Sequence, residues 1–173
     1  MKKLSLENGA IVRPIVEFLP LFSEESKGGA GYVLFHPTKD DGEPNVYLDG
    51  VRAALKKARG IYVFYDSRGR AIYAGKTVEQ SLWHEMNSAY NRPRGESQQT
   101  WRVKHPMIRP HPYDPDQHRV VGREDLLLHE LAEYASAFEV LAPFISEMEA
   151  LLVRGFANDL VNKKMEKFAV EKE

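Results

Sequence analysis

Two runs of aromatic and β-branched residues, 60–66 and 71–77, stand on either side of the turn Arg68-Gly69. This pattern predicts a β-hairpin, and the hairpin is the feature that most limits what the chain can fold into. A turn at Arg68-Gly69 implies three cross-strand pairs: Tyr62 with Gly75, Phe64 with Tyr73, and Asp66 with Ala71.

The predicted register brings two phenols together. Because side chains alternate between the faces of a strand, Tyr62 and Tyr73 share a face as diagonal neighbours about 7 Å apart. Gly75, opposite Tyr62, leaves a gap above the sheet where a backbone or a phosphate can approach. The alternative is that the two tyrosines pack in a core, which is the commoner fate of tyrosine in strands.

The strings Gly60-Ile61-Tyr62 and Tyr73-Ala74-Gly75-Lys76 resemble the signature of the GIY-YIG nucleases. The resemblance continues downstream in order, with a helix-like stretch at residues 79–91, then Glu149, then Asn162. It implies a divalent-metal-dependent endonuclease that hydrolyses DNA phosphodiester bonds, and RNA is not excluded as a substrate.

The resemblance also implies a role for each site residue. Tyr62 would activate the attacking water, Tyr73 would position the water or the phosphate, and Glu149 would hold a single Mg²⁺ or Mn²⁺ ion. The expected substrate-binding residues are Gly75, Lys76, His84, Arg92 and Asn162. Asn162 is open to a second interpretation, as a helix C-cap.

Glu149 is also unusual in the residues that surround it on the predicted helix. In a helix its side chain lies beside Ile145, Leu152 and Val153, so it interrupts an apolar stripe. A carboxylate in such a stripe needs a partner, a metal or a proton. The alternative to a metal ligand is a glutamate at the edge of the stripe that pairs with a lysine or arginine.

One helix departs from the family pattern. If Leu82-Trp83 is aligned with the family, Glu85 replaces the usual arginine and Ala89 the usual histidine or tyrosine. We therefore expect Glu85 near the mouth of the site, engaged by Arg92 or Lys76 or available to a cation. Either the active site is rearranged or the domain has lost catalysis.

The chain is expected to form a small α/β domain at residues 58–168, with residues 1–57 as an N-terminal extension packed on it. The sheet is expected to be three-stranded and mostly antiparallel, built from the hairpin and residues 135–141 and flanked by helices. Other expected elements are strands at 12–18 and 32–35, and helices at 51–58, 78–91, 124–133 and 144–158. Residues 93–122, with five prolines, are expected to form a loop. Its histidines (105, 111 and 118) match no standard zinc spacing.

Charge is distributed unevenly along the chain. Residues 52–109 carry twelve Lys or Arg against four acids, although the whole chain has a net charge of −1. A local positive field suits a polyanion such as DNA, but it is equally compatible with charges that balance across the folded surface.

Bulk composition limits the other possibilities. The 173 residues are 43% hydrophobic and contain no cysteine, which predicts one globular domain without disulfides or thiolate metal sites. No apolar run reaches the length of a membrane span, so a cytoplasmic protein is expected. The rivals to an endonuclease are a catalytically silent nucleic-acid-binding module and a protein-interaction domain whose tyrosines are core residues.

Overall fold

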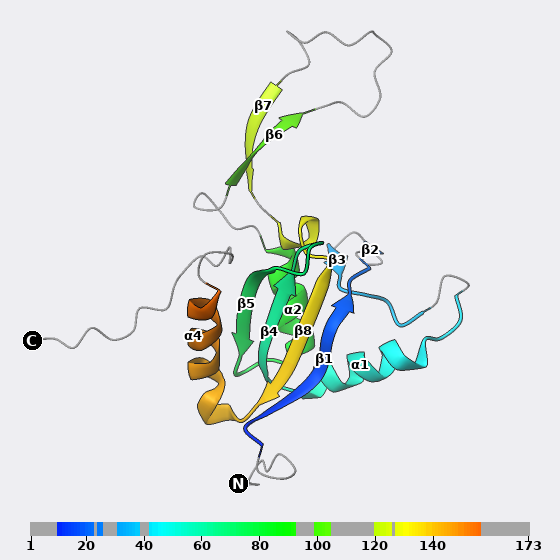
Figure 1. Cartoon of the computed structure of the whole chain (residues 1–173). Coiled ribbons are helices and arrows are strands. Elements are labelled where there is room, and N and C mark those ends of the chain that lie inside the picture. The colour runs from blue at the N-terminus through cyan, green and yellow to red at the C-terminus, as the bar shows by residue number, and fades with distance from the viewer. Residues whose placement is uncertain are drawn as a thin grey trace, which may run out of the picture.

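The computed structural model describes residues 10–22, 24–25, 31–38, 42–92, 99–104, 120–125 and 127–156, with backbone alone at 24–25, 99–104 and 120–125. Figure 1 shows the elements, which are β1 (Val12–Pro20), β2 (Glu24–Glu25), β3 (Tyr32–Val33), α1 (Val46–Lys57), β4 (Gly60–Tyr65), β5 (Ala71–Thr77), α2 (Leu82–Asn91), β6 (Gln99–Lys104), β7 (Val120–Asp125), β8 (Tyr134–Val140) and α4 (Ile145–Gly155), with short 3-10 turns η3 (Leu128–Glu130) and η4 (Ala142–Phe144).

An antiparallel sheet of four strands, in the order β1-β8-β4-β5, organises the α/β fold. The expected count of three strands is wrong, because β1 pairs with β8 from Val12 opposite Val140 to Pro20 opposite Tyr134. The physical reason is that β8 would otherwise present a full row of unpaired backbone groups on the side away from β4. Strand β1 comes from the residues expected to form an extension.

The hairpin β4–β5 has the predicted register over most of its length. Tyr62 lies opposite Gly75 and Phe64 opposite Tyr73, as expected, but Ala71 pairs with Tyr65 rather than with Asp66. Asp66 belongs to the turn, since its Oδ1 accepts the backbone N–H groups of Arg68 and Arg70, both at 2.9 Å. An aspartate that bonds to its own turn in this way leaves the strand ladder.

The helices begin at capping residues that the sequence pattern did not single out. α1 begins at Val46 rather than at residue 51, because Asn45 Oδ1 accepts the N–H of Leu48 at 3.1 Å. α2 begins after Ser81, whose hydroxyl accepts the N–H of His84. No helix in the described part of the chain is long and apolar enough to cross a membrane.

Two regions differ from expectation between α2 and β8. The predicted loop at residues 93–122 contains β6 and the start of β7, which form a separate two-stranded antiparallel sheet. The predicted helix at 124–133 is reduced to the 3-10 turn Leu128–Glu130, because β7 continues to Asp125. The alternation of apolar and polar residues in β6 and β7 covers only a few positions, and prolines are frequent in the segment around it. The sequence pattern therefore did not indicate a pair of strands here.

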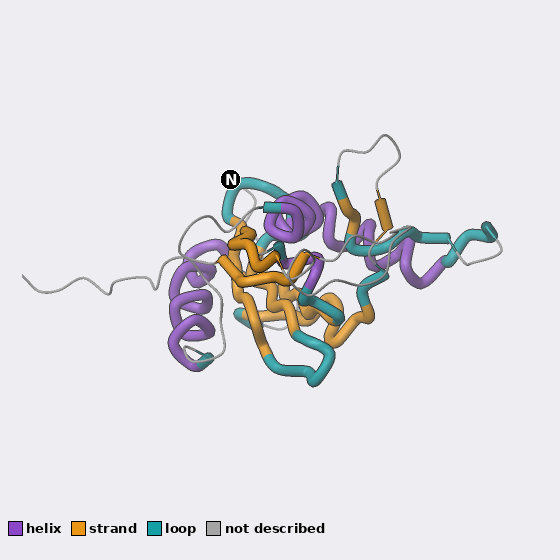
Figure 2. Tube along the Cα trace, turned by 90° about the horizontal axis from the view of Figure 1, so that it is seen from above, coloured by secondary structure: helices purple, strands orange, loops and turns teal. Residues whose placement is uncertain are grey.

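The two faces of the four-stranded sheet carry different helices. α1 and α2 pack on one face, where they share a buried cluster with Tyr62, Phe64 and Tyr73. α4 packs on the other face, where Val153 meets Val63 and Ala74, and Ile145 meets Ile61. Figure 2 shows α2 and α4 on different sides of the strands.

Gly60 fixes the approach of β4 to β8. Its φ is +155°, and a Cβ at this position would lie 2.1 Å from the carbonyl oxygen of Phe138. Any side chain would therefore push the two central strands apart, so the first glycine of the motif is required by the sheet itself.

Candidate functional site

Tyr62, the proposed base, lies in the core of the fold. Its side chain has no exposed surface, and its ring packs edge-on against Phe64, with 5.6 Å between centroids, and beside Tyr73 at 6.0 Å. The two tyrosines thus share a face, as the register predicts. Their surroundings are the apolar side chains of α1 and α2, including the fully buried Leu82 and Met86.

The Tyr62 phenol is held in its neutral form. Burial is the largest cause that raises its pKa well above the usual value of 10.0, and the neighbouring Tyr73 and Glu85 raise the pKa further, while Arg92 lowers it. Tyr73 lies near Tyr62 Oη, but Oη has no partner that meets the geometry of a hydrogen bond. A phenol with a raised pKa is a poor general base at neutral pH.

The gap expected at Gly75 is filled by the ring opposite. A Cβ built on Gly75 would lie 2.4 Å from both Cζ and Oη of Tyr62. Gly75 is itself buried. The expectation that a phosphate can approach here is therefore wrong, because the glycine makes room for the tyrosine and not for a ligand.

Glu85 is engaged by Arg92, one of its expected partners, and it influences the phenol of Tyr62, but the cleft between Tyr62 and Glu149 at whose mouth it was expected does not form. The Arg92 guanidinium is 3.2 Å from Glu85 Oε1 and also donates to the Ser88 hydroxyl at 3.1 Å. Glu85 raises the pKa of Tyr62, so its carboxylate acts on the phenol through space. The pair places a neutralised carboxylate, rather than a cation, beside the two tyrosines.

Lys76 and Glu149 form a second group on the other face of the sheet. Lys76 Nζ lies 2.8 Å from Glu149 Oε2 and 3.4 Å from the Ser146 hydroxyl. Lys76 alternates with Gly75 along β5, and α4 packs on the face opposite Tyr62. The hairpin register and the interrupted stripe at Glu149 predict one concave surface lined by Tyr62, Tyr73, Gly75, Lys76, Glu149 and Asn162. That prediction is wrong, because the sheet separates Lys76 and Glu149 from the two tyrosines and Gly75.

Of the two remaining predicted residues, only His84 is described, and it belongs to neither group. His84 is exposed on the first turn of α2, next to Glu85 but without a described contact to either tyrosine. Asn162 lies outside the described residues. The described residues of the predicted site therefore form two separate groups, a buried tyrosine cluster and the Lys76–Glu149 ion pair.

A divalent ion on Glu149 fits this arrangement poorly. The carboxylate is mostly buried against the Lys76 ammonium, so a metal ion would have to displace a cation that is already in contact. Among the described residues, no group of three His, Asp or Glu side chains is placed to hold a metal. We therefore derive no chemical step through an ion at Glu149.

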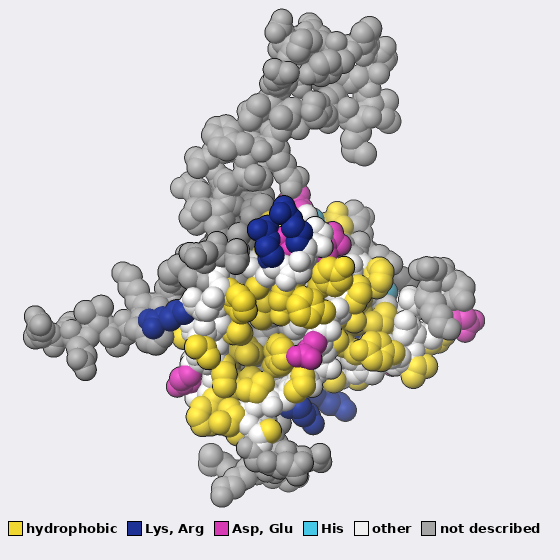
Figure 3. Space-filling model, viewed as in Figure 1, with side chains coloured by type: hydrophobic (Ala, Val, Ile, Leu, Met, Phe, Trp, Pro, Cys, Tyr) yellow, Lys and Arg dark blue, Asp and Glu magenta, His cyan; other side chains and the backbone are white. Residues whose placement is uncertain are grey.

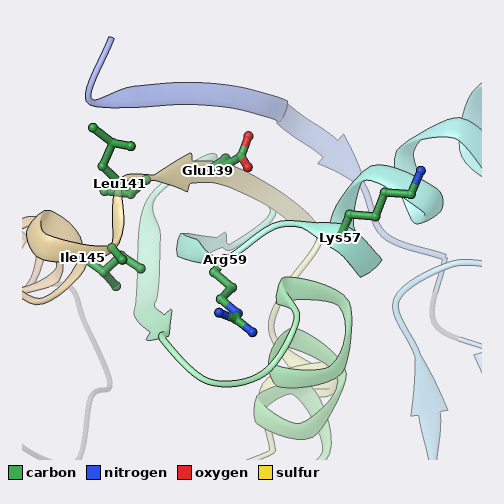
Figure 4. Close-up of a pocket in the computed structure, with 7 residues that line it drawn as sticks. Lys57, Arg59, Glu139, Leu141 and Ile145 are labelled. Carbon is green, nitrogen blue, oxygen red and sulfur yellow. The ribbon is translucent and has the colours of Figure 1, made fainter. Parts of the chain in front are cut away.

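A small cavity lies at the corner where α1 leads into β4 and β8 leads into α4. Its volume is about 110 Å³, and its lining includes Lys57, Arg59, Glu139 and Ile145. Figure 4 shows that the head groups of Lys57 and Arg59 point away from one another. The cavity therefore has a cationic rim, but its basic groups do not converge on one ligand atom.

Some of the cations in the predicted positive segment have no acidic partner. Within the described residues, Lys56, Lys57, Arg59 and Arg68 form no ion pair. The first three are exposed and adjacent at the end of α1. Part of this charge stabilises the helix C-terminus, but three cations on one corner also make a local positive field.

The sequence analysis did not identify two asparagines of α2 that bind the segment around β3. Asn91 accepts the N–H of Tyr32 and donates to its carbonyl, both at 2.7 Å, and Asn87 accepts the N–H of Leu34. The available signal was their spacing of four residues on α2, which places both amides on one helix face.

Comparison with protein-family models, with curated proteins and with solved structures finds no match to this chain. The resemblance to the GIY-YIG nucleases therefore rests on the residues of the hairpin, on Glu149 and on Asn162.

Proposed function

We propose that this chain is a nucleic-acid-binding domain on a GIY-YIG-like fold, in which the residues of the expected nuclease centre stabilise the fold instead of hydrolysing a phosphodiester. The observation that carries the proposal is the separation of Tyr62 from Glu149 by the sheet, with each already engaged. Tyr62 is buried as a neutral phenol, and Glu149 is paired with Lys76.

The charge distribution supports a polyanionic partner. Glu85 and Glu149 are paired with Arg92 and Lys76, whereas the cations at the end of α1 have no described ion pair. Phosphate contacts made by such exposed cations release counterions, so the affinity should fall steeply with salt.

Binding of a labelled 30-base-pair DNA duplex at two salt concentrations tests the proposal. We expect measurable affinity at about 50 mM salt and a loss of tenfold or more at about 200 mM. The double variant Lys56→Glu/Lys57→Glu should weaken binding more than Lys163→Glu/Lys164→Glu, a second pair of adjacent lysines with the same change in charge. Affinity that is absent, or equal in the two variants, contradicts the proposal.

A second candidate is metal-dependent hydrolysis, and one observation favours it. The register sets Tyr62 and Tyr73 on a common face beside the Glu85 carboxylate, which is the arrangement of phenols that the resemblance requires. This candidate needs a change in structure that exposes Tyr62 and frees Glu149.

A plasmid-nicking assay in Mg²⁺ or Mn²⁺ separates the two candidates. For a silent binder, wild type and Glu149→Ala give the same background, and Glu85→Ala leaves cleavage at that background while it tightens DNA binding by removing a repulsive charge. Metal-dependent nicking that Glu149→Ala and Glu85→Ala both depress would establish hydrolysis instead.

A further inference from the structure

The face of the sheet on which α4 packs is only partly covered by that helix. It carries an aromatic cluster that has no role in the nucleic-acid binding proposed above. The rings of Phe18 from β1, Tyr65 from β4 and Tyr134 from β8 lie together on the side where α4 packs. Phe18 stacks on Tyr65 with 4.3 Å between centroids and lies 6.4 Å from Tyr134. Three neighbouring strands thus contribute one aromatic ring each.

This cluster is accessible. Phe18 is 52% exposed, and Tyr65 and Tyr134 are partly exposed. In Figure 2, α2 lies above the strands and α4 at their left, and no described helix lies on the lower side of the strands in the picture. Figure 3 shows the result, a continuous hydrophobic surface across the front of the sheet.

The backbone of Phe18 holds its ring in this position. Phe18 is the only residue other than glycine with a positive φ in the described chain, at +47°, and its N–H donates to the buried Ser136 hydroxyl at 3.0 Å. A bulky side chain in this conformation is strained, and such strain is often retained where a side chain has a function. The strain here presents an aromatic face to the surface.

A basic turn lies next to the ring. A Cβ built on Gly69 would lie 3.8 Å from Phe18, which places the β4–β5 turn against the cluster. Arg68 in this turn is exposed and forms no ion pair with a described residue, whereas Arg70 is paired with Asp66. Bonds from the turn to Asp66 fix the loop that carries Arg68. Figure 3 shows basic side chains at the upper edge of the hydrophobic surface.

We infer that this face binds unpaired bases of a single-stranded nucleic acid, with Phe18 as the main stacking surface and Arg68 as a phosphate contact. Aromatic rings on a sheet surface accept bases of any sequence, because every base has a π-face, and a basic edge follows the phosphates. This inference rests on the proposed function and adds to it a defined face for single strands, separate from the cations at the end of α1 that are proposed to contact a duplex.

Fluorescence anisotropy of labelled 12-mer oligonucleotides, DNA and RNA, tests the inference on the full chain. Phe18→Gly removes the ring and suits the positive φ, so the variant should fold at least as well as wild type. We expect it to weaken single-strand binding about tenfold, from the loss of one stacked base. Arg68→Glu should weaken binding as well, whereas Phe18→Tyr should keep it.

Phe22→Gly is the matched control, because Phe22 is an exposed phenylalanine just beyond β1 that takes no part in the cluster. Equal losses in Phe22→Gly and Phe18→Gly would overturn the inference. So would duplex binding that persists with its salt dependence while Phe18→Gly binds single strands like wild type, a result that leaves the proposed function standing. Absence of binding to both single strands and duplex would remove the proposed function as well.

A second copy of this chain is the main competing occupant of the face. Sedimentation velocity of wild type and Phe18→Gly detects it. A wild-type dimer that Phe18→Gly dissociates, with no change in oligonucleotide affinity, would overturn the inference in favour of self-association. A monomer in both cases, with the expected loss of affinity, supports it.

Discussion

On the face of the sheet that α1 and α2 cover, Tyr62, Phe64 and Tyr90 are completely buried, whereas on the opposite face Phe18 keeps 52% of its surface exposed. Both faces are rich in aromatic residues, so residue type alone does not set their chemistry. The faces differ in how much of each is covered by helices. The covered face confines its phenol to the neutral form, and the open face presents its rings to other molecules.

The largest expected difference between the faces is in the cost of removing a ring. Phe64→Ala should lower the free energy of unfolding by about 3–5 kcal/mol, because it leaves a cavity in a closely packed core. Phe18→Ala should cost less than about 1 kcal/mol, since much of the ring is already in water. Urea denaturation of both variants measures the two values. Similar costs would mean that the open face is covered in solution.

Gly75 tests how tightly the covered face is packed. Gly75→Ala should destabilise the protein by about 1–3 kcal/mol, because the new methyl group meets the fully buried Tyr62 ring. Gly50→Ala is its control, since Gly50 lies in α1 with no atom within 4 Å of the added Cβ. Helix propensity predicts a gain of about 0.5–1 kcal/mol there. A neutral Gly75→Ala would show that Tyr62 has room to move.

The pH dependence of stability tests the neutral phenol of Tyr62. Its pKa is raised in the folded protein, so above pH 10 the unfolded chain releases this proton while the folded chain retains it. Stability should therefore fall as pH rises beyond 10, by at most about 1.4 kcal/mol per pH unit from this group. Tyr62→Phe should reduce that slope and leave stability at pH 7 within about 1 kcal/mol, because Oη has no hydrogen bond to lose. Denaturation midpoints at pH 7, 10 and 11 decide the matter, and an unchanged slope counts against burial of the phenol.

The two ion pairs give the smallest difference. Double-mutant cycles with glutamine should return about 0.5–1 kcal/mol for Lys76–Glu149, which is mostly shielded by α4, and less than about 0.5 kcal/mol for the more exposed Arg92–Glu85 pair. Raising the salt concentration should weaken the second coupling more than the first. The reverse ranking would indicate that α4 is loosely attached to the sheet.

The sequence was informative wherever local chemistry decides the structure. The hairpin register at Tyr62 and Phe64 and the strand at residues 135–141 follow from alternation and turn chemistry, and the α/β class follows from them. The pairing of Glu85 with Arg92, seven residues on and on the same helix face, was also predictable from helix spacing. These features involve residues that are close in sequence.

The failures concern contacts between distant parts of the chain. Pairing of β1 with β8 depends on which sheet edge remains open, and no local pattern in residues 12–20 specifies that. The assignment of Glu149 to the face opposite Tyr62 depends on which face α4 covers. Strand periodicity places Lys76 and Gly75 on opposite faces, but it does not say which face a helix seventy residues later will use.

The strand order has a consequence for the order in which the protein can be made. β1 is synthesised before its partner β8, which ends at Val140, so β1 has no neighbour in the four-stranded sheet until that later segment has been translated. The hairpin β4–β5 can close early, but β4 also waits for β8. A nascent chain that pauses before residue 134 therefore exposes two strand edges that can pair with other chains, and the timing of one late strand decides between folding and aggregation.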